Sequence, residues 1–277
     1  MHSRSIAVLF LLAMLFEATP SASAQDAEST PVASKPLTSD EMTSALQSDS
    51  LSIPTPGEFF AAMDKTGKTN WQALYRKPIP PAFSSRPQNA LSLGGLIADG
   101  YLAVEAEDAQ QVKNIGKDVI EMAKALGVKE QVMSRGNSIN EFAENNEWNT
   151  LKEELEATQN EVKLAFAELQ DQALITLVTL GGWIRGLEAV SGWAATNYSP
   201  ESARLLRQPG IAAFLSSKLS TLPDAERNDP CVKFISKKIE AIEKLVTFGG
   251  DSTPSQEDVN NIHKAATEIS TAISTKQ

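Results

Sequence analysis

The sequence predicts an all-α protein, a multi-helix bundle of about seven or eight main helices that follows a flexible N-terminal leader. Several segments place apolar residues at alternating steps of three and four, which puts those residues on one face of a helix. Proline or a capping Ser, Thr or Asp stands before several of these segments, as is typical of helix starts. Alternating clusters of Val, Ile, Thr and Tyr, which are typical of strands, are almost absent.

Residues 1–24 are expected to be a secretory signal peptide. Arg4 supplies the early positive charge, residues 6–16 are apolar, and Ala22-Ser23-Ala24 is a cleavage signal of small residues. Cleavage after Ala24 leaves 277 − 24 = 253 residues that begin with Gln25. A membrane anchor is the alternative, but the apolar run is short for a span of about 20 residues.

The expected location is therefore the bacterial periplasm or the medium outside the cell. No Cys adjoins the cleavage site, so a lipoprotein anchor is not indicated. Outside the leader, residues 173–184 carry no charge, and this run is also too short to span a bilayer. We expect no transmembrane anchor after the signal is removed.

Residues 25–56 are rich in Ser, Thr, Pro, Ala and acidic side chains, so we expect a flexible segment, with a short helix at 39–47. Residues 57–84 are predicted to be an arm of short helices. Pro56 suits the first position of a helix that carries Phe59 and Phe60, and Trp71 marks a second apolar patch. The arm is expected to pack on the helical body rather than to hang free.

The helical body, residues 85–277, is predicted to be a single domain. Its first helix covers about 85–104, and the second covers about 108–126 and ends at Gly127. Residues 128–145 form one helix, or two that break at Gly136-Asn137. Residues 147–197 contain no proline, and we expect either one helix with a bend, for which Gly181-Gly182 is a candidate place, or two helices.

Proline marks the later helix starts. Ser199-Pro200 opens a helix that restarts at Pro209-Gly210 and ends near Leu222-Pro223, and Asp229-Pro230 opens the next, which Gly249 closes. Thr253-Pro254 or Ser255 starts the last helix. The last two helices have clear apolar faces, formed by Val232, Ile235, Ile239, Ile242 and Val246, and by Val259, Ile262, Ala266, Ile269 and Ile273.

Two similar stretches are predicted to form the centre of the bundle. Leu93-Gly94-Gly95-Leu96-Ile97 resembles Leu180-Gly181-Gly182-Trp183-Ile184, and each is soon followed by one charged residue and another glycine. Glycines within a helix most plausibly let another backbone come close. We expect the two helices to cross at close-packing glycines, namely Gly94, Gly95, Gly181, Gly182 and Gly186. Asp99 and Arg185 would then lie near each other.

A family resemblance rests on the same stretches. Asn89-Ala90-Leu91-Ser92-Leu93-Gly94 with Ala98-Asp99, and Gly181-Gly182-Trp183-Ile184 with Gly186-Leu187, resemble paired signatures of uncharacterised secreted all-helical bacterial proteins. The resemblance covers about residues 85–195. It implies a fold and a location and no activity. An acidic residue stands at the place of Arg185 in that pattern, so the pairing with Asp99 is not expected as a family feature.

The residue inventory disfavours an enzyme. The mature chain has one histidine, His263, and one cysteine, Cys231, so the usual zinc, di-iron and Cys-x-x-Cys-His haem sites are not expected, nor is any cofactor. A Ser-His-Asp triad would have to use His263, and the sequence has no Gly-x-Ser-x-Gly motif for the nucleophile of such a triad. A carboxylate-dependent hydrolase is a weaker alternative, because the many glutamates of 141–161 suit a solvated helix face. The lone Cys231 is expected to be a half-buried structural residue.

Two functions compete. A net charge of −10 disfavours nucleic acid as a partner. The first function is a structural or protein-interaction role with a protein partner, in an oligomeric state that the sequence leaves open. The alternative is a small-molecule-binding module with a pocket near the glycine crossing. That pocket would be lined by Asp99, Arg185, Trp183, Tyr101 and Trp193.

Overall fold

The computed structural model describes residues 55–249 and 252–276. The signal peptide, its cleavage site after Ala24 and the predicted helix at 39–47 lie outside the described residues. The described residues all belong to one compact unit, Leu37–Gln277. Nine α-helices of seven or more residues occur among them, with no strand, which confirms the all-α class.

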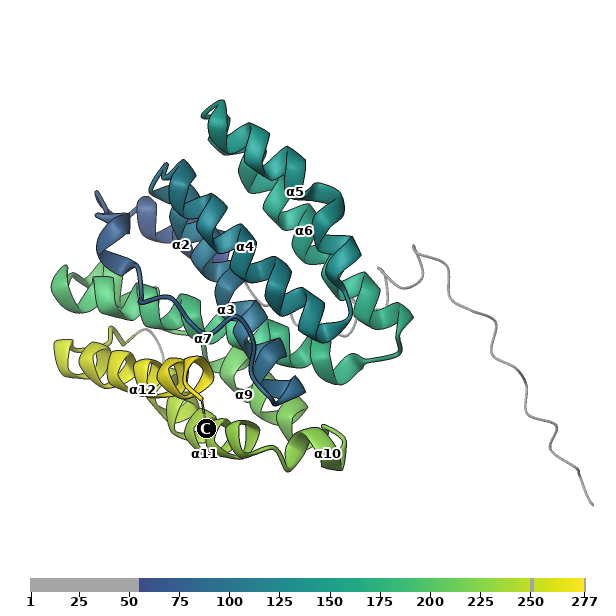
Figure 1. The fold of residues 1–277 in the computed structure, drawn as a ribbon. Coiled ribbons are helices and arrows are strands. Elements are labelled where there is room, and N and C mark those ends of the chain that lie inside the picture. The colour runs from purple at the N-terminus through teal and green to yellow at the C-terminus, as the bar shows by residue number, and fades with distance from the viewer. Residues whose placement is uncertain (1–54, 250–251, 277) are drawn as a thin grey trace, which may run out of the picture. The chain divides into compact units, whose positions relative to one another are not determined.

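The helices follow one another with short connections (Figure 1). In chain order they are α2 (Pro56–Asp64), the 3-10 helix η1 (Trp71–Leu74), α3 (Arg86–Glu105), α4 (Ala109–Leu126), α5 (Lys129–Glu144), α6 (Trp148–Glu168), α7 (Gln172–Thr196), α8 (Pro200–Arg204), α9 (Pro209–Ser220), α10 (Asp224–Arg227), α11 (Pro230–Val246) and α12 (Gln256–Ser274).

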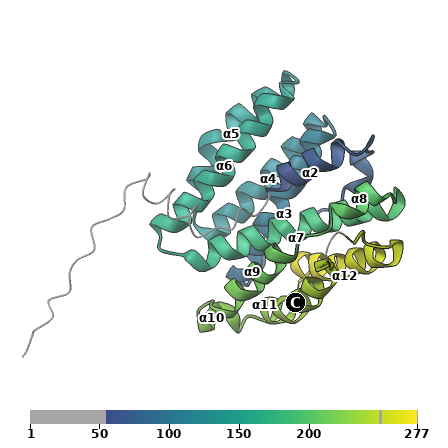
Figure 2. The same ribbon diagram turned by 180° about the vertical axis from the view of Figure 1, so that it is seen from behind.

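Helices α3 and α7 lie at the centre of the bundle and pack against each other. Both are buried around most of their circumference, whereas α4, α11 and α12 each bury a single apolar face. Seen from behind, α7 runs across the middle, with α2 and α3 on one side and α11 and α12 on the other (Figure 2). Helices α5 and α6 pair with each other beside α4 and α3.

The four turns that link α3 to α7 share one backbone geometry. Each contains a residue with positive φ, namely Glu107, Gly127, Asn146 and Gln170. The next N–H in each turn donates to a carbonyl five residues earlier, which is the Schellman closure of a helix end. Only Gly127 was recognisable from the sequence, because glycine is the residue that commonly adopts this conformation.

The long segment 147–197 is two helices, α6 and α7, and they are separated well before Gly181-Gly182. The chain turns at Gln170, and the side chain of Asp171 accepts a hydrogen bond from the N–H of Leu174 to begin α7. Helix α7 continues unbroken through the glycines because they pack against α3. Tertiary packing therefore outweighs the low helix propensity of glycine at this place.

Three other boundaries are refined. Residues 129–144 form one helix, without a break at Gly136. The segment from Ser199 to Leu222 is two separate helices, α8 and α9, instead of one that restarts. Helix α11 ends at Val246, before Gly249, whereas α12 begins after the cap Ser255, as predicted.

The arm packs on the body. Phe60 and Met63 of α2 are fully buried, and the rings of Phe60 and Trp71 meet edge to face with centroids 5.9 Å apart. The amide of Asn89 holds the chain after the arm, since its Oδ1 accepts from the N–H of Phe83 at 2.7 Å and its Nδ2 donates to the Phe83 carbonyl at 3.1 Å. The arm is thus part of the core.

Candidate functional site

Gly94 and Gly181 form the point of closest approach between α3 and α7. A Cβ atom on Gly94 would lie 1.9 Å from the carbonyl oxygen of Val178, and a Cβ on Gly181 would lie 1.9 Å from that of Leu91. Each glycine faces the carbonyl three residues before the other. The two similar stretches therefore make one reciprocal contact in which no side chain can be accommodated.

The other glycines of the predicted crossing have different neighbours. Gly95 faces Arg76, whose guanidinium nitrogen would lie 3.0 Å from an added Cβ. Gly182 and Gly186 leave room for a Cβ at ordinary contact distances, and the nearest group to Gly186 is the ring of Phe59. The close approach thus rests on two of the five glycines.

Asp99 and Arg185 form a buried ion pair beside this crossing. Arg185 Nε donates to Asp99 Oδ1 at 2.7 Å, and the two residues are only 3% and 7% exposed. Arg76, from the extended chain after η1, donates from Nε to the second oxygen, Oδ2, also at 2.7 Å. A single carboxylate on α3 therefore holds one arginine from α7 and one from the arm.

The remaining nitrogens of Arg185 and Nη1 of Arg76 donate hydrogen bonds as well, whereas Nη2 of Arg76 lies 2.7 Å from Asp99 Oδ2 without forming one. Arg185 donates to the carbonyl of Leu74 at 2.6 Å and to Glu188 at 3.1 Å, and Arg76 donates to the hydroxyl of Ser274 at 2.8 Å. Burial by itself lowers the pKa of Arg185, but the charges of Asp99 and Glu188 outweigh it and raise that pKa. We call Arg76, Asp99, Arg185 and Glu188 the ion network.

The predicted aromatic members of the site are core residues. Trp183 is buried, and its Nε1 donates to Gln208 at 2.9 Å. Tyr101 is buried against Gly57 of α2, and burial, then the charges of Glu156 and Glu58, raise its pKa. Trp193 is buried as well. None of the three lines the cleft between the arm, α3 and α4.

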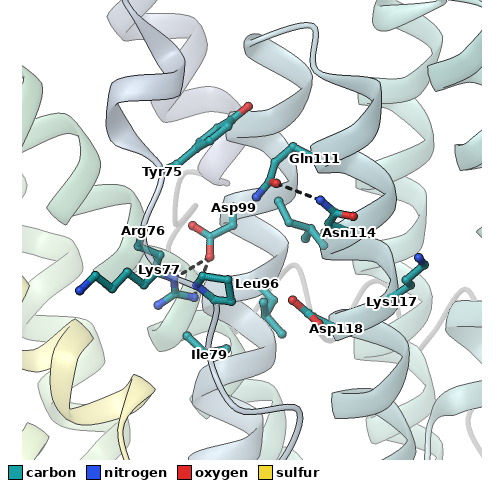
Figure 3. Close-up of a pocket in the computed structure, with 12 residues that line it drawn as sticks. Tyr75, Arg76, Lys77, Ile79, Leu96, Asp99, Gln111, Asn114, Lys117 and Asp118 are labelled. Carbon is teal, nitrogen blue, oxygen red and sulfur yellow. Dashed lines mark hydrogen bonds and ion pairs between the residues drawn. The ribbon is translucent and has the colours of Figure 1, made fainter.

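A cleft of about 450 Å³ opens between the arm, α3 and α4 (Figure 3). Asp99 is the one predicted site residue that lines it, and Arg185 does not. Both polar and apolar side chains line it, namely Tyr75, Arg76, Lys77, Pro78, Ile79, Leu96, Asp99, Gln111, Asn114, Ile115, Lys117 and Asp118. The ion network therefore forms part of one wall of an open site.

Asp118 is the distinctive charge of this cleft. It projects from α4 toward Leu96, on the opposite side from the arm (Figure 3). It is half-buried, and burial followed by the negative charge of Asp99 raises its pKa. No hydrogen bond or ion pair joins it to another described residue. Lys77 and Lys117 are exposed, and their ammonium groups point away from the cleft (Figure 3).

His263 and Cys231 are both packed into the structure. His263 Nδ1 lies 3.3 Å from the hydroxyl of Ser191, and its ring lies against Gly192, where a Cβ would meet it at 2.9 Å. Ser191 is fully buried and donates to the carbonyl of Leu187 at 2.6 Å. Cys231 is 2% exposed, and burial, with the charge of Asp229, raises its pKa to about 12. Its place in the first turn of α11 therefore does not favour a thiolate.

The sequence reasoning missed Arg76, Gln111, Asn114 and Asp118. Arg76 had no signal of its own, because only the structure shows that Gly95 lies opposite its guanidinium and makes room for it. The α4 residues had none, since polar side chains on the outer face of an amphipathic helix are common. Within the part of the chain that the structure describes, no group of three or more His, Cys, Asp or Glu is placed to hold a metal ion.

Helix α7 as a whole is longer than the uncharged run of residues 173–184 that is too short to span a membrane. By length and composition it is apolar enough to cross a bilayer, although the uncharged run within it is short. Here 78% of that apolar window is buried inside the bundle. The core helix of a folded bundle and a membrane span satisfy the same test of length and hydropathy.

No protein-family model matches this chain, and no curated protein or solved structure matches it either. The resemblance to secreted helical proteins therefore stays a prediction. Polar residues of its motif have structural partners in this fold. The Asn89 amide is hydrogen-bonded to the backbone of Phe83, and the Ser92 hydroxyl donates to the carbonyl of Ile273 near the end of α12.

Proposed function

We propose that this protein is an exported, non-enzymatic binding protein and that its site is the cleft between the arm, α3 and α4. The cleft itself is the observation that carries the proposal. Its volume of about 450 Å³ lies within the range of about 300–1,000 Å³ that is common for small-molecule sites. Its mixed lining offers hydrogen-bonding groups beside the apolar side chains of Leu96 and Ile115.

The ion network supports this choice of site because it holds one wall in place. Arg76 is tied to α3 through Asp99 and to α12 through Ser274, so the arm cannot shift without breaking buried polar contacts. A site on supported elements keeps its geometry before the ligand arrives, which lowers the entropic cost of binding.

The glycine crossing is a poorer candidate. Gly94 and Gly181 bring two backbones into direct contact there, so no ligand fits between them. Trp183, Tyr101 and Trp193 fill the core instead of lining an open space. The pocket expected at the crossing is therefore replaced, in this proposal, by the cleft that Asp99 shares.

The proposal of a non-enzymatic role rests on how the reactive groups are used. His263 and Ser191 pack against each other, with the Ser191 hydrogen donated to a carbonyl, and burial raises the pKa of the Cys231 thiol to about 12. The net charge of −10 supports a partner other than nucleic acid.

Export is supported by the leader pattern of residues 1–24. The test is the intact mass of the protein from the periplasm and from the medium after expression in a bacterium. A mature form that begins at Gln25 supports the proposal. An uncleaved chain retained in the cytoplasm contradicts it.

Binding is tested by an NMR screen of the mature protein against neutral, anionic and cationic small molecules. Amide shifts that cluster at residues 75–79 and 111–118 are expected for at least one class. Asn114→Trp should abolish them, because an indole on this exposed lining position fills the cleft. Lys124→Trp is the matched control, as this exposed residue of α4 lies outside the lining and its ion pair is with Glu121, which does not line the cleft either.

Shifts elsewhere, or shifts that persist in Asn114→Trp, would contradict the choice of the cleft as the site. Both variants should keep the melting temperature of the parent protein. That condition ensures that lost binding reports on the cleft and not on the fold.

A further inference from the structure

We infer that the cleft binds a positively charged alkylammonium group, with the carboxylate of Asp118 as its counter-ion. The inference rests on the proposed function, since it requires that the cleft is a binding site. It adds the chemical class of the ligand and the residue that selects it. It is carried by the position of Asp118, a half-buried carboxylate without a partner among the described residues, next to the ion network, in which each carboxylate already faces an arginine.

Counting the charges at this place leaves a negative excess. Asp99 and Glu188 face Arg76 and Arg185 at contact distances, so the ion network contributes two negative and two positive charges. Asp118 adds one more negative charge. The ammonium groups of Lys77 and Lys117 point away into solvent, where water and salt screen them (Figure 3).

An anionic ligand fits this site less well. Among the described residues, Arg76 is the one cation whose charged group faces the cleft, and it is already engaged by the carboxylate of Asp99 and the hydroxyl of Ser274. An anion would have to displace a buried ion pair and would also be repelled by Asp118. A cation avoids both costs, and it supplies a partner for a carboxylate that is partly withdrawn from water.

The apolar part of the cleft suits the stem of such a ligand. Ile79, Leu96 and Ile115 line the cleft together with Asp118. Methylene groups can pack on these side chains while the charged end meets the carboxylate, as the stem of a lysine does on a protein surface. The compact charge of an ammonium can meet the single carboxylate at the cleft wall.

The pH dependence of binding follows from the same groups. Asp118 on α4 faces Asp99 of α3 across the cleft, while Arg76, Tyr75 and Lys77 come from the arm and Lys117 from α4. Burial and Asp99 raise the pKa of Asp118. Binding needs its ionised form, so affinity is complete above that pKa and falls as the pH drops through it. The ammonium stays protonated throughout, because its own pKa is about 10.4.

The test is an NMR titration of the mature protein with pentylamine, 1-pentanol and pentanoate, three probes of one chain length that differ in charge. We expect pentylamine to shift the amides of residues 111–118 and to bind at least about tenfold more tightly than the other two. Asp118→Asn should weaken pentylamine binding by about tenfold or more. Glu121→Gln is the matched control, since it removes the same charge from an exposed position one turn away on α4 and should change affinity less than about twofold.

The source of the ammonium is tested with a lysine derivative blocked at both ends, Nα-acetyl-lysine-N-methylamide. Tighter binding of this derivative than of pentylamine assigns the cleft to a lysine side chain of a protein partner. Tighter binding of pentylamine assigns it to a free amine. Both results support the inference.

Two outcomes overturn the inference, and they differ in what they imply. Preferential binding of 1-pentanol or pentanoate in the cleft, or equal losses in Asp118→Asn and Glu121→Gln, rejects the ammonium ligand and leaves the proposed binding site standing. If no probe shifts the cleft amides and the wider screen shows nothing there, the proposed function fails as well.

Discussion

Asp99 joins three segments that lie far apart in the sequence. Its two oxygens accept from Arg76 of the arm and Arg185 of α7, while its own backbone belongs to α3. A buried ion pair adds little net stability compared with a well-packed apolar core, but removal of one member leaves the other charges buried and unpaired. Asp99 is therefore important chiefly for what its loss would expose.

We predict that Asp99→Ala lowers the free energy of unfolding by about 3–5 kcal/mol, because the buried Arg185 and the partly buried Arg76 lose their shared carboxylate. Chemical denaturation measures this value. Asp224→Ala is the control: this carboxylate also contacts an arginine, Arg227, but its side chain is 81% exposed, so a change within about 1 kcal/mol is expected. Equal effects of the two substitutions would contradict the structural importance of the network.

At the crossing, Gly94→Ala and Gly181→Ala should each destabilise the protein severely. The added Cβ would lie 1.9 Å from a backbone oxygen, so α3 and α7 would have to separate. A loss of more than about 3 kcal/mol is expected, since overpacking against a rigid backbone exceeds the usual range of about 1–3 kcal/mol. Thermal and chemical denaturation measure the loss.

Gly116→Ala and Gly136→Ala are the matched controls for that experiment. Both glycines lie within helices, and an added Cβ would meet nothing within 4 Å. Alanine should stabilise each helix by about 0.5–1 kcal/mol. A loss of stability at the two crossing glycines with a gain at the two control glycines would support the crossing contact. A similar small change in stability at all four positions would contradict it.

The thiol of Cys231 should be almost inert in the folded protein. It is 2% exposed, and burial raises its pKa to about 12, so little reactive thiolate is present at pH 8. Reaction with a thiol reagent should follow the rate of unfolding and become rapid in denaturant. Rapid labelling of the native protein at pH 8 would show that the thiol is accessible and contradict this prediction.

At the scale of elements, the connections between α3 and α7 show where sequence patterns are weak. Each of the four successive turns contains a residue in the left-handed backbone conformation. In three of them this residue is not glycine but Glu107, Asn146 or Gln170. Asp108 and Asp171 follow two of these residues and cap the next helix. The capping aspartate could be recognised in the sequence. The residue before it has the strained left-handed backbone, and nothing in the sequence marked it.

Gln170→Gly should therefore stabilise the protein by about 0.5–1 kcal/mol. Glycine removes a left-handed strain of about 1–2 kcal/mol, and the greater freedom of the unfolded chain offsets part of the gain. Gln170 is exposed, so the loss of its side chain should cost little. Equilibrium denaturation measures the effect, and a loss of stability would show that the residue does not adopt this conformation.

At the scale of the whole molecule, stability should be greatest at the centre and least at α5. Helix α7 buries residues along most of its length, whereas α5 buries only Val132 and Ala143. Local opening costs least where few apolar contacts are broken. In hydrogen exchange, amides of α3 and α7 should exchange slowest and those of α5 fastest among the long helices. Equal protection of α5 and α7 would contradict this ordering.

The segment after the arm and the end of the last helix are both held by α3. Asn89 holds the chain after the arm through Phe83, and Gln88 and Ser92 cap the end of α12. The carbonyls at the end of a helix lack intrahelical partners, so these side chains supply what the chain itself cannot. The first turns of α3 thus fasten both the arm and the last helix to the body.

The sequence by itself determined the elements whose signals are local. Apolar residues in steps of three and four defined the faces of α4, α11 and α12, and caps such as Ser199 and Ser255 defined helix starts. The similar Leu-Gly-Gly stretches also predicted the crossing and the pairing of Asp99 with Arg185. These signals succeed because one helix turn, or two similar helices in contact, contain all the information that is needed.

Only the tertiary structure decided the site. Arg76 reaches Asp99 because the arm folds back over α3, and Asp118 joins the cleft because α4 packs beside it. Neither contact has a fixed spacing in the sequence. The same holds for the break at Gln170, where the packing of α7 against α3 keeps Gly181 and Gly182 helical. Long-range packing energies set these features, and no local pattern encodes them.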